Sequence, residues 1–345
     1  SDVYKRQRFP GDDTQVKLQF SPDGRTLLTA NADGGTLRLW ELPESEVYLP
    51  MPMGIPFANT SRFLPDGSIG VLTSSAALRI APDLSVTRTE INLADSGRQI
   101  SQILPSPDWT RGFSLGARTR SAGDDQARQL SAIDLSTGRV LKTTPVETSS
   151  FGTLALHPDG TEVAVPGKAL RFYDSETLEP SGRQAIPNTV DPVFGAAYHP
   201  KGTAVALRGR EACHLIDLET GEERWQTPLP GRGMFAPDIA IAFQPGEGRY
   251  LATPHERGWI ALIDVKDGQV VKHFRTTEQQ SPLTSRMERV EHTRLSWTAD
   301  GSALLARDHS VGIKVIEVPS GEIRAHYRSP RLEDNPGYRA PVSYT

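Results

Sequence analysis

A short turn motif that recurs along the whole chain constrains the fold more than any other feature. Three copies combine a proline with an aspartate and a glycine, and the other four keep two of these residues. The seven copies occupy residues 21–24, 64–67, 106–109, 157–160, 199–202, 244–246 and 298–301. Between the proline positions, where Ala299 stands in the last copy, the intervals are 43, 42, 51, 42, 45 and 54 residues. A period of about 40–45 residues is that of a four-stranded propeller blade. The two longer intervals indicate loop insertions.

The segments around each motif also repeat. An apolar strand precedes the turn, as at residues 154–156, and a second strand follows it, as at 162–165. A third strand ends in an acidic residue, as at 170–174, and a turn such as 136–138 leads into a fourth strand. Proline presets φ at the first corner, aspartate bonds back to the chain, and glycine adopts the positive φ that closes the turn. The sequence therefore predicts an all-β fold, a seven-bladed β-propeller of four-stranded antiparallel blades.

The propeller is expected to occupy residues 13–329. Residues 1–12 are interpreted as a non-native or irregular segment, because residues 1–7 resemble a translated sequencing linker. Residues 330–345 are expected to form an irregular tail, since they contain three prolines and a glycine within a short polar stretch. Residues 321–328 suit the outer strand of the last blade, so each blade is expected to come from one continuous segment.

Over roughly residues 13–328 the units resemble the WD40-like or YVTN-type repeats of bacterial β-propellers. The repeats are degenerate: they lack the opening Gly-His pair and the Trp-Asp dipeptide, and Trp40-Glu41 is the nearest match. The resemblance implies the fold, which hosts many functions. The complete set of repeats and the varying lengths of the loops favour an interaction module.

No convincing catalytic constellation is present. Gly112-Phe113-Ser114-Leu115-Gly116 fits a nucleophile elbow, but it lies where other blades have their second strand, so Ser114 is expected to be a strand residue. His157 and His199 precede the turn proline and are expected to pack in the turns. The acidic pair at 124–125 lies in a loop with several arginines and lacks the spacing of a calcium loop. We therefore expect no enzyme activity, no metal and no cofactor.

Bulk properties narrow the class of partner. The formal net charge of −4 argues against a dedicated nucleic-acid binder. The single cysteine, Cys213, excludes an intramolecular disulfide and suits a reducing compartment. No apolar stretch approaches the roughly 18 residues that span a bilayer. These properties predict a cytoplasmic domain that is monomeric and contacts neither nucleic acid nor membrane.

Basic side chains are concentrated in the loops between second and third strands and in the connections between blades. In WD40-like rings these segments share one face, called here the top face. The basic residues that we assign to it are Lys168, Arg208, Arg210, Arg232, His255, Arg257, Arg286, Arg307 and His309. Arginine pairs bidentately with carboxylate or phosphate, so an acidic or phosphorylated peptide is the expected ligand. Ordinary exposed loop arginines are the competing explanation.

The sequence thus predicts a non-catalytic scaffold or sensor module that binds a protein or peptide partner on the top face. An alternative is an accessory propeller that gates or regulates a missing upstream catalytic domain, such as an NTPase, kinase or hydrolase. A third hypothesis, an enzyme or small-ligand binder that uses the central channel, would need acids or histidines converging on that channel. The sequence offers arginines there instead.

Overall fold

The computed structural model describes most of the chain between residues 16 and 327. The described residues are 16–21, 26–31, 36–41, 51–52, 58–64, 66–73, 75–81, 85–91, 100–116, 127–147, 153–167, 169–183, 186–187, 193, 195–209, 211–229, 241–255, 259–275, 294–298, 300–308 and 312–327. The predicted end segments, 1–12 and 330–345, lie outside them.

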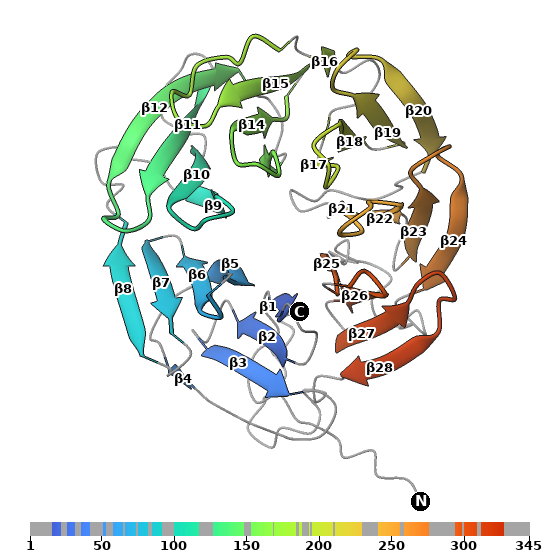
Figure 1. The fold of residues 1–345 in the computed structure, drawn as a ribbon, viewed down its shortest axis with the longest axis horizontal. Helices are drawn as coiled ribbons and strands as arrows, with labels where there is room; N and C mark the ends of the chain where they lie inside the picture. Colours follow the sequence, from blue (N-terminus) through green and yellow to red (C-terminus); the bar gives the residue numbers. More distant parts are fainter. Residues whose placement is uncertain are drawn as a thin grey trace, which may run out of the picture.

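Within this part of the chain all regular secondary structure is β-strand, and the strands pair into seven four-stranded antiparallel sheets. We number the sheets 1 to 7 in chain order. They lie around a centre, with the first strand of each sheet nearest the centre and the fourth at the rim (Figure 1). The prediction of an all-β propeller is confirmed.

The strand bounds follow the repeat. Sheet 1 contains β1 (Val16–Phe20), β2 (Thr26–Asn31), β3 (Thr36–Glu41) and β4 (Met51–Pro52), and sheet 2 contains β5 (Ala58–Phe63), β6 (Ile69–Thr73), β7 (Ala76–Ile80) and β8 (Val86–Glu90). Sheet 3 contains β9 (Ile100–Pro105), β10 (Arg111–Gly116), β11 (Ala127–Asp134) and β12 (Val140–Glu147), and sheet 4 contains β13 (Ala155–Leu156), β14 (Glu162–Val165), β15 (Ala169–Asp174) and β16 (Ile186–Pro187). Sheet 5 contains β17 (Gly195–Tyr198), β18 (Ala204–Arg208), β19 (Ala212–Asp217) and β20 (Glu223–Pro228). Sheet 6 contains β21 (Ala242–Phe243), β22 (Tyr250–His255), β23 (Trp259–Asp264) and β24 (Val270–Arg275), and sheet 7 contains β25 (Arg294–Trp297), β26 (Ala303–Asp308), β27 (Gly312–Glu317) and β28 (Ile323–Tyr327).

Every sheet is built from one continuous segment, as the sequence predicted for the last one. β28 is the fourth strand of sheet 7, and among the described strands none is exchanged between the first and last sheets. β1 contacts both β5 and β25, so sheet 1 lies between sheets 2 and 7 (Figure 1). Packing between sheets, rather than a shared strand, therefore holds the first and last sheets together.

The recurring motif forms the turn between the first two strands. Gly67, Gly160, Gly202 and Gly301 all have positive φ, and each donates its N–H to the carbonyl three residues earlier. In the third copy Trp109 holds this position with a φ of 61°, which is strained for a residue with a Cβ. Its indole is buried against the preceding sheet 2, where an added Cβ at Gly70 would lie 2.4 Å from the ring. This contact offsets the backbone strain.

The acidic residue that ends the third strand organises the second turn. The carboxylates of Asp134, Asp174 and Asp217 each accept hydrogen bonds from the backbone N–H groups two and three residues later. Hydrogen bonds of this kind keep the pKa of each of these carboxyls below its usual value, and that of Asp217 falls to about 2. Asp134, Asp174 and Asp217 therefore cap the turns that follow their strands.

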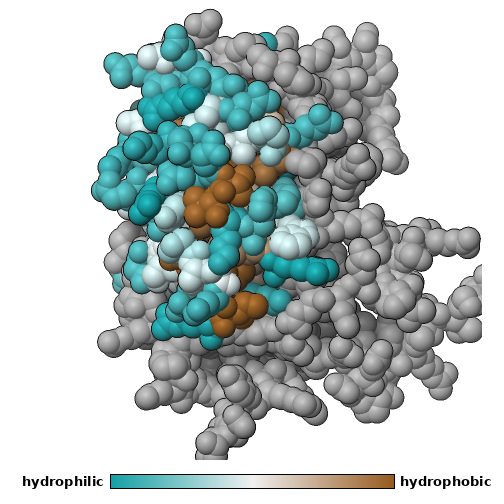
Figure 2. Space-filling model, turned by 90° about the vertical axis from the view of Figure 1, so that its right-hand side faces the viewer, coloured by the Kyte–Doolittle hydropathy of each residue, from teal (hydrophilic) through white to brown (hydrophobic). Residues whose placement is uncertain are grey.

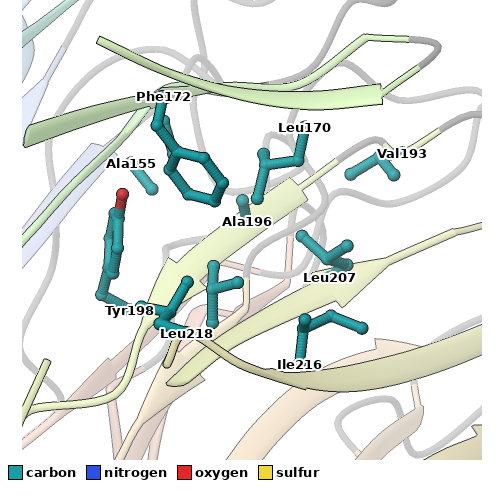
Figure 3. Packing of buried hydrophobic residues seen from close by; sticks show 11 residues of the cluster. Ala155, Leu170, Phe172, Val193, Ala196, Tyr198, Leu207, Ile216 and Leu218 are labelled. Atoms are coloured by element: carbon teal, nitrogen blue, oxygen red, sulfur yellow. The ribbon is translucent and has the colours of Figure 1, made fainter. Parts of the chain in front are cut away.

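Adjacent sheets pack face to face, because a single sheet cannot bury both of its faces. Figure 3 shows the packing between sheets 4 and 5, where Leu170 and Phe172 of β15 lie opposite Leu207 of β18 and Ile216 of β19. All four side chains are buried. Tyr198 stands at the edge of this cluster (Figure 3).

The fourth strands form the outer edges of the sheets. β-Bulges interrupt them: Ala132 pairs with Lys142 and Ile133 with Val140, so Leu141 has no partner across the strand pair. Such bulges protect an edge from pairing with another chain. On the side that includes β20 and β24, hydrophobic side chains form small patches among hydrophilic ones (Figure 2).

Candidate partner-binding face

Arg208, at the end of β18, is the best-defined residue of the predicted basic face. Its side chain is fully buried: Nη1 donates to the carbonyl oxygens of Gly209 (2.6 Å) and Ala212 (3.0 Å), and Nη2 donates to that of Leu229 (3.0 Å). These carbonyls flank the β18–β19 loop and begin the segment that leaves β20. The prediction that Arg208 contacts a partner is therefore wrong. A buried guanidinium with three backbone acceptors fixes the loop instead of facing solvent.

Cys213 pairs with Arg208 across the two strands and is also buried. Burial raises the pKa of its thiol to about 12, so the thiolate needed for nucleophilic or metal chemistry does not form near neutrality. The top end of sheet 5 thus contains a structural arginine and an unreactive thiol.

His255 ends β22 at the same side of sheet 6, and it too is buried. Its Nε2 lies 2.7 Å from Nδ1 of His273 on β24, and the two rings meet edge to face. Burial, with smaller contributions from the charges of His273 and Arg208, lowers the pKa of His255 to about 4. His255 is therefore neutral at pH 7 and does not supply the exposed positive charge that the sequence predicted.

The side chains that do face solvent at this end of sheet 6 were not predicted. Arg275, the last residue of β24, is exposed, and its guanidinium carbon lies 5.7 Å from the ring centroid of Trp259, the first residue of β23. The two residues are directly opposed in the strand pairing, and His273 is also exposed. We call Trp259, His273 and Arg275 the top-rim cluster. An arginine held over an aromatic face keeps its fork available for a carboxylate while part of its surface is already desolvated.

The other predicted basic residues cannot be placed on this face. Arg307 lies in β26, opposite Arg294 and Ile313 in the strand pairing, and its side chain is outside the described residues. The remaining members of the predicted set also lie outside them: Lys168, Arg210, Arg232, Arg257, Arg286 and His309. Their role stays a prediction.

Ser114, the residue considered as a catalytic nucleophile, is part of a strand. Ser114 is buried in the middle of β10, opposite Ile103 of β9 and Ser131 of β11, so it is a strand residue as expected. In the described part of the chain no three histidine, cysteine, aspartate or glutamate side chains gather as a metal site would require. The acidic pair at 124–125 lies outside that part.

His157 and His199 do pack in the turns, as predicted. Nε2 of His157 lies 3.1 Å from the carbonyl oxygen of Gly202, in the corresponding turn of the next sheet. The ring of His199 packs against Gly248 in the same way: a Cβ added at Gly248 would lie 2.3 Å from Nε2 of His199, as one added at Gly202 would from Nε2 of His157. Both histidines therefore join neighbouring sheets.

The fold and its turn motifs define a β-propeller repeat protein. The sequence profile of the family described as "Outer membrane protein assembly factor BamB" matches residues 87–332, and the chain belongs to this family. It is also 27% identical over 158 residues to "WD repeat-containing protein SL1-17" of Schistosoma mansoni. That match covers 44% of this chain and 49% of the relative, so the chain matches about half the length of that curated relative. Both comparisons support a WD40/YVTN-type propeller. None of the described segments forms a helix that could cross a membrane.

Proposed function

We propose that the chain is a non-catalytic interaction module whose seven sheets are the blades of one closed ring, and whose top rim at sheet 6 binds an acidic segment of a protein partner. The observation that supports the partner's chemistry is the exposed Arg275 over Trp259, with His273 beside it. The family description names an assembly factor, which agrees with an interaction module.

The same description concerns the outer membrane, whereas the sequence composition led us to expect the cytoplasm. A cell-envelope location competes with that expectation, and the single buried cysteine is compatible with both. The binding chemistry proposed for the top rim is the same in either compartment.

Fluorescence anisotropy with a labelled oligo-glutamate peptide tests the proposal, with oligo-lysine and a neutral peptide of equal length as comparisons. Arg275→Glu removes the proposed anchor. Lys266→Glu changes the net charge equally, but Lys266 is exposed in the turn at the other end of β24, roughly 17 Å away for five strand residues.

Of the three peptides, we expect only the acidic one to bind. Arg275→Glu should weaken its affinity at least tenfold, and Lys266→Glu should change that affinity less than twofold. Equal weakening by both variants would mean that only net charge matters. No binding of the acidic peptide would refute the proposed ligand class.

A further inference from the structure

His157 makes two contacts that both need a proton on its ring. Nδ1 lies 2.6 Å from Oδ1 of Asp159, and Nε2 lies 3.1 Å from the carbonyl oxygen of Gly202. Burial tends to raise the pKa of Asp159, but hydrogen bonds from Thr161 and His157 bring it down to about 2, so the carboxylate is ionised and only accepts. A carbonyl oxygen also only accepts. Both hydrogen bonds therefore exist together only when the imidazole holds two protons.

The next two junctions make the same type of contact without that requirement. Nδ1 of His199 accepts a hydrogen bond from the backbone N–H of Lys201 (3.2 Å), so this ring is neutral, and burial lowers its pKa. In sheet 6 the equivalent residue is Gln244, whose Nε2 donates to the carbonyl oxygen of Gly301 at 2.8 Å. At one repeat position, three successive sheets thus present a histidine whose two contacts need two ring protons, a histidine that accepts at Nδ1, and an amide.

The charged groups near His157 have partners of their own. Tyr198 meets the His157 ring edge to face at 5.1 Å, and its hydroxyl donates to the buried carboxylate of Glu162. Glu162 also accepts hydrogen bonds from Ser181 and Arg183. In the adjoining turn of sheet 5 Lys201 forms an ion pair with Glu247, and in that of sheet 3 the Asp108 carboxylate accepts from Ser106 and Thr110. The direct ionic contact of His157 is with Asp159.

We propose that His157 is a proton-dependent latch between sheets 4 and 5. With two ring protons it joins Asp159 in its own turn to Gly202 in the next turn, and with one proton it loses one of these bonds. Removing one of the two ring protons by raising the pH therefore loosens this junction of the propeller. The junctions made by His199 and Gln244 do not need a second ring proton and stay closed.

Hydrogen exchange of the wild-type chain between pH 5.5 and 8.5 tests the latch, after correction for the intrinsic pH dependence of exchange. Residues 195–209 contain Gly202, and residues 241–255 contain Gly248 and serve as the internal comparison. We expect protection in 195–209 to fall about tenfold more than protection in 241–255, the loss of one hydrogen bond to a charged group.

His157→Gln supplies the matched variant, because Gln244 shows that an amide makes this contact. The variant is expected to remove the extra loss of protection, whereas His199→Gln leaves it in place. Equal pH profiles for the two segments of the wild-type chain would overturn the proposal, whether or not either variant folds. Persistence of the extra loss in His157→Gln would overturn it as well.

Discussion

Replacing Arg208 with methionine tests whether this arginine has a structural role or a role in binding at the surface. Methionine fills most of the same volume but leaves the buried carbonyls of Gly209, Ala212 and Leu229 without the guanidinium donors. The carbonyls of Gly209 and Leu229 cost about 1–2 kcal/mol each, whereas that of Ala212 still accepts from the Gly209 N–H, and removing a buried charge recovers part of the loss. The expected net loss in the free energy of unfolding is about 1–3 kcal/mol.

Urea unfolding followed by far-ultraviolet circular dichroism measures this loss. The comparison requires that the free energy of unfolding has the same slope against urea concentration in the variant and in the wild-type chain. Arg275→Met is the matched control, because this exposed arginine forfeits only its contact with Trp259, worth about 0.5–1 kcal/mol. If Arg208→Met shifts the midpoint no more than the control does, the structural role of Arg208 is refuted and a surface role returns.

Three further predictions concern stability. Gly248→Ala and Gly246→Ala both place a Cβ at positive φ, but only the first meets a side chain, at 2.3 Å, so urea midpoints should show it to be less stable by about a further 1–2 kcal/mol; equal losses would contradict the contact. Glu162→Gln weakens the buried carboxylate's charge-assisted bonds and should cost about 1–3 kcal/mol, against less than about 0.5 kcal/mol for the exposed control Glu219→Gln; similar midpoints would refute the network. The pKa of His255 lies below its unfolded value of 6.5, at about 4, so folding stability should fall by up to about 3 kcal/mol relative to His255→Gln as the pH drops between these values, and parallel pH profiles would argue against it.

The turns were predictable because their chemistry is local. Proline, aspartate and glycine fix φ and the backbone hydrogen bonds within four residues, and Gly160 and Gly202 have the positive φ that this chemistry requires. The strand order followed from the period of the motif, since each unit supplies four consecutive strands. Trp109 shows where the local rule ends, because a contact with Gly70 of another sheet overrides it.

The basic face was harder to predict because side-chain direction depends on packing between strands. Arg208 and His255 lie at strand ends, where the sequence pattern does not distinguish a side chain that turns into the sheet from one that faces solvent. Arg275 and Trp259 were missed because they are 16 positions apart and meet only through the pairing of β23 with β24. Aligning the strand ends of sheet 6 before choosing candidate residues would have brought this pair together.

Mapping the bound peptide on the chain tests the proposed function most directly. Hydrogen exchange should be measured with and without the oligo-glutamate peptide, at a resolution that separates the two ends of β23 and β24. The account predicts added protection at residues 259–260 and 273–275, the end of sheet 6 that contains the top-rim cluster. It predicts none at the turn 264–269 at the opposite end. Protection confined to that turn, or unchanged exchange under saturating peptide, would contradict it.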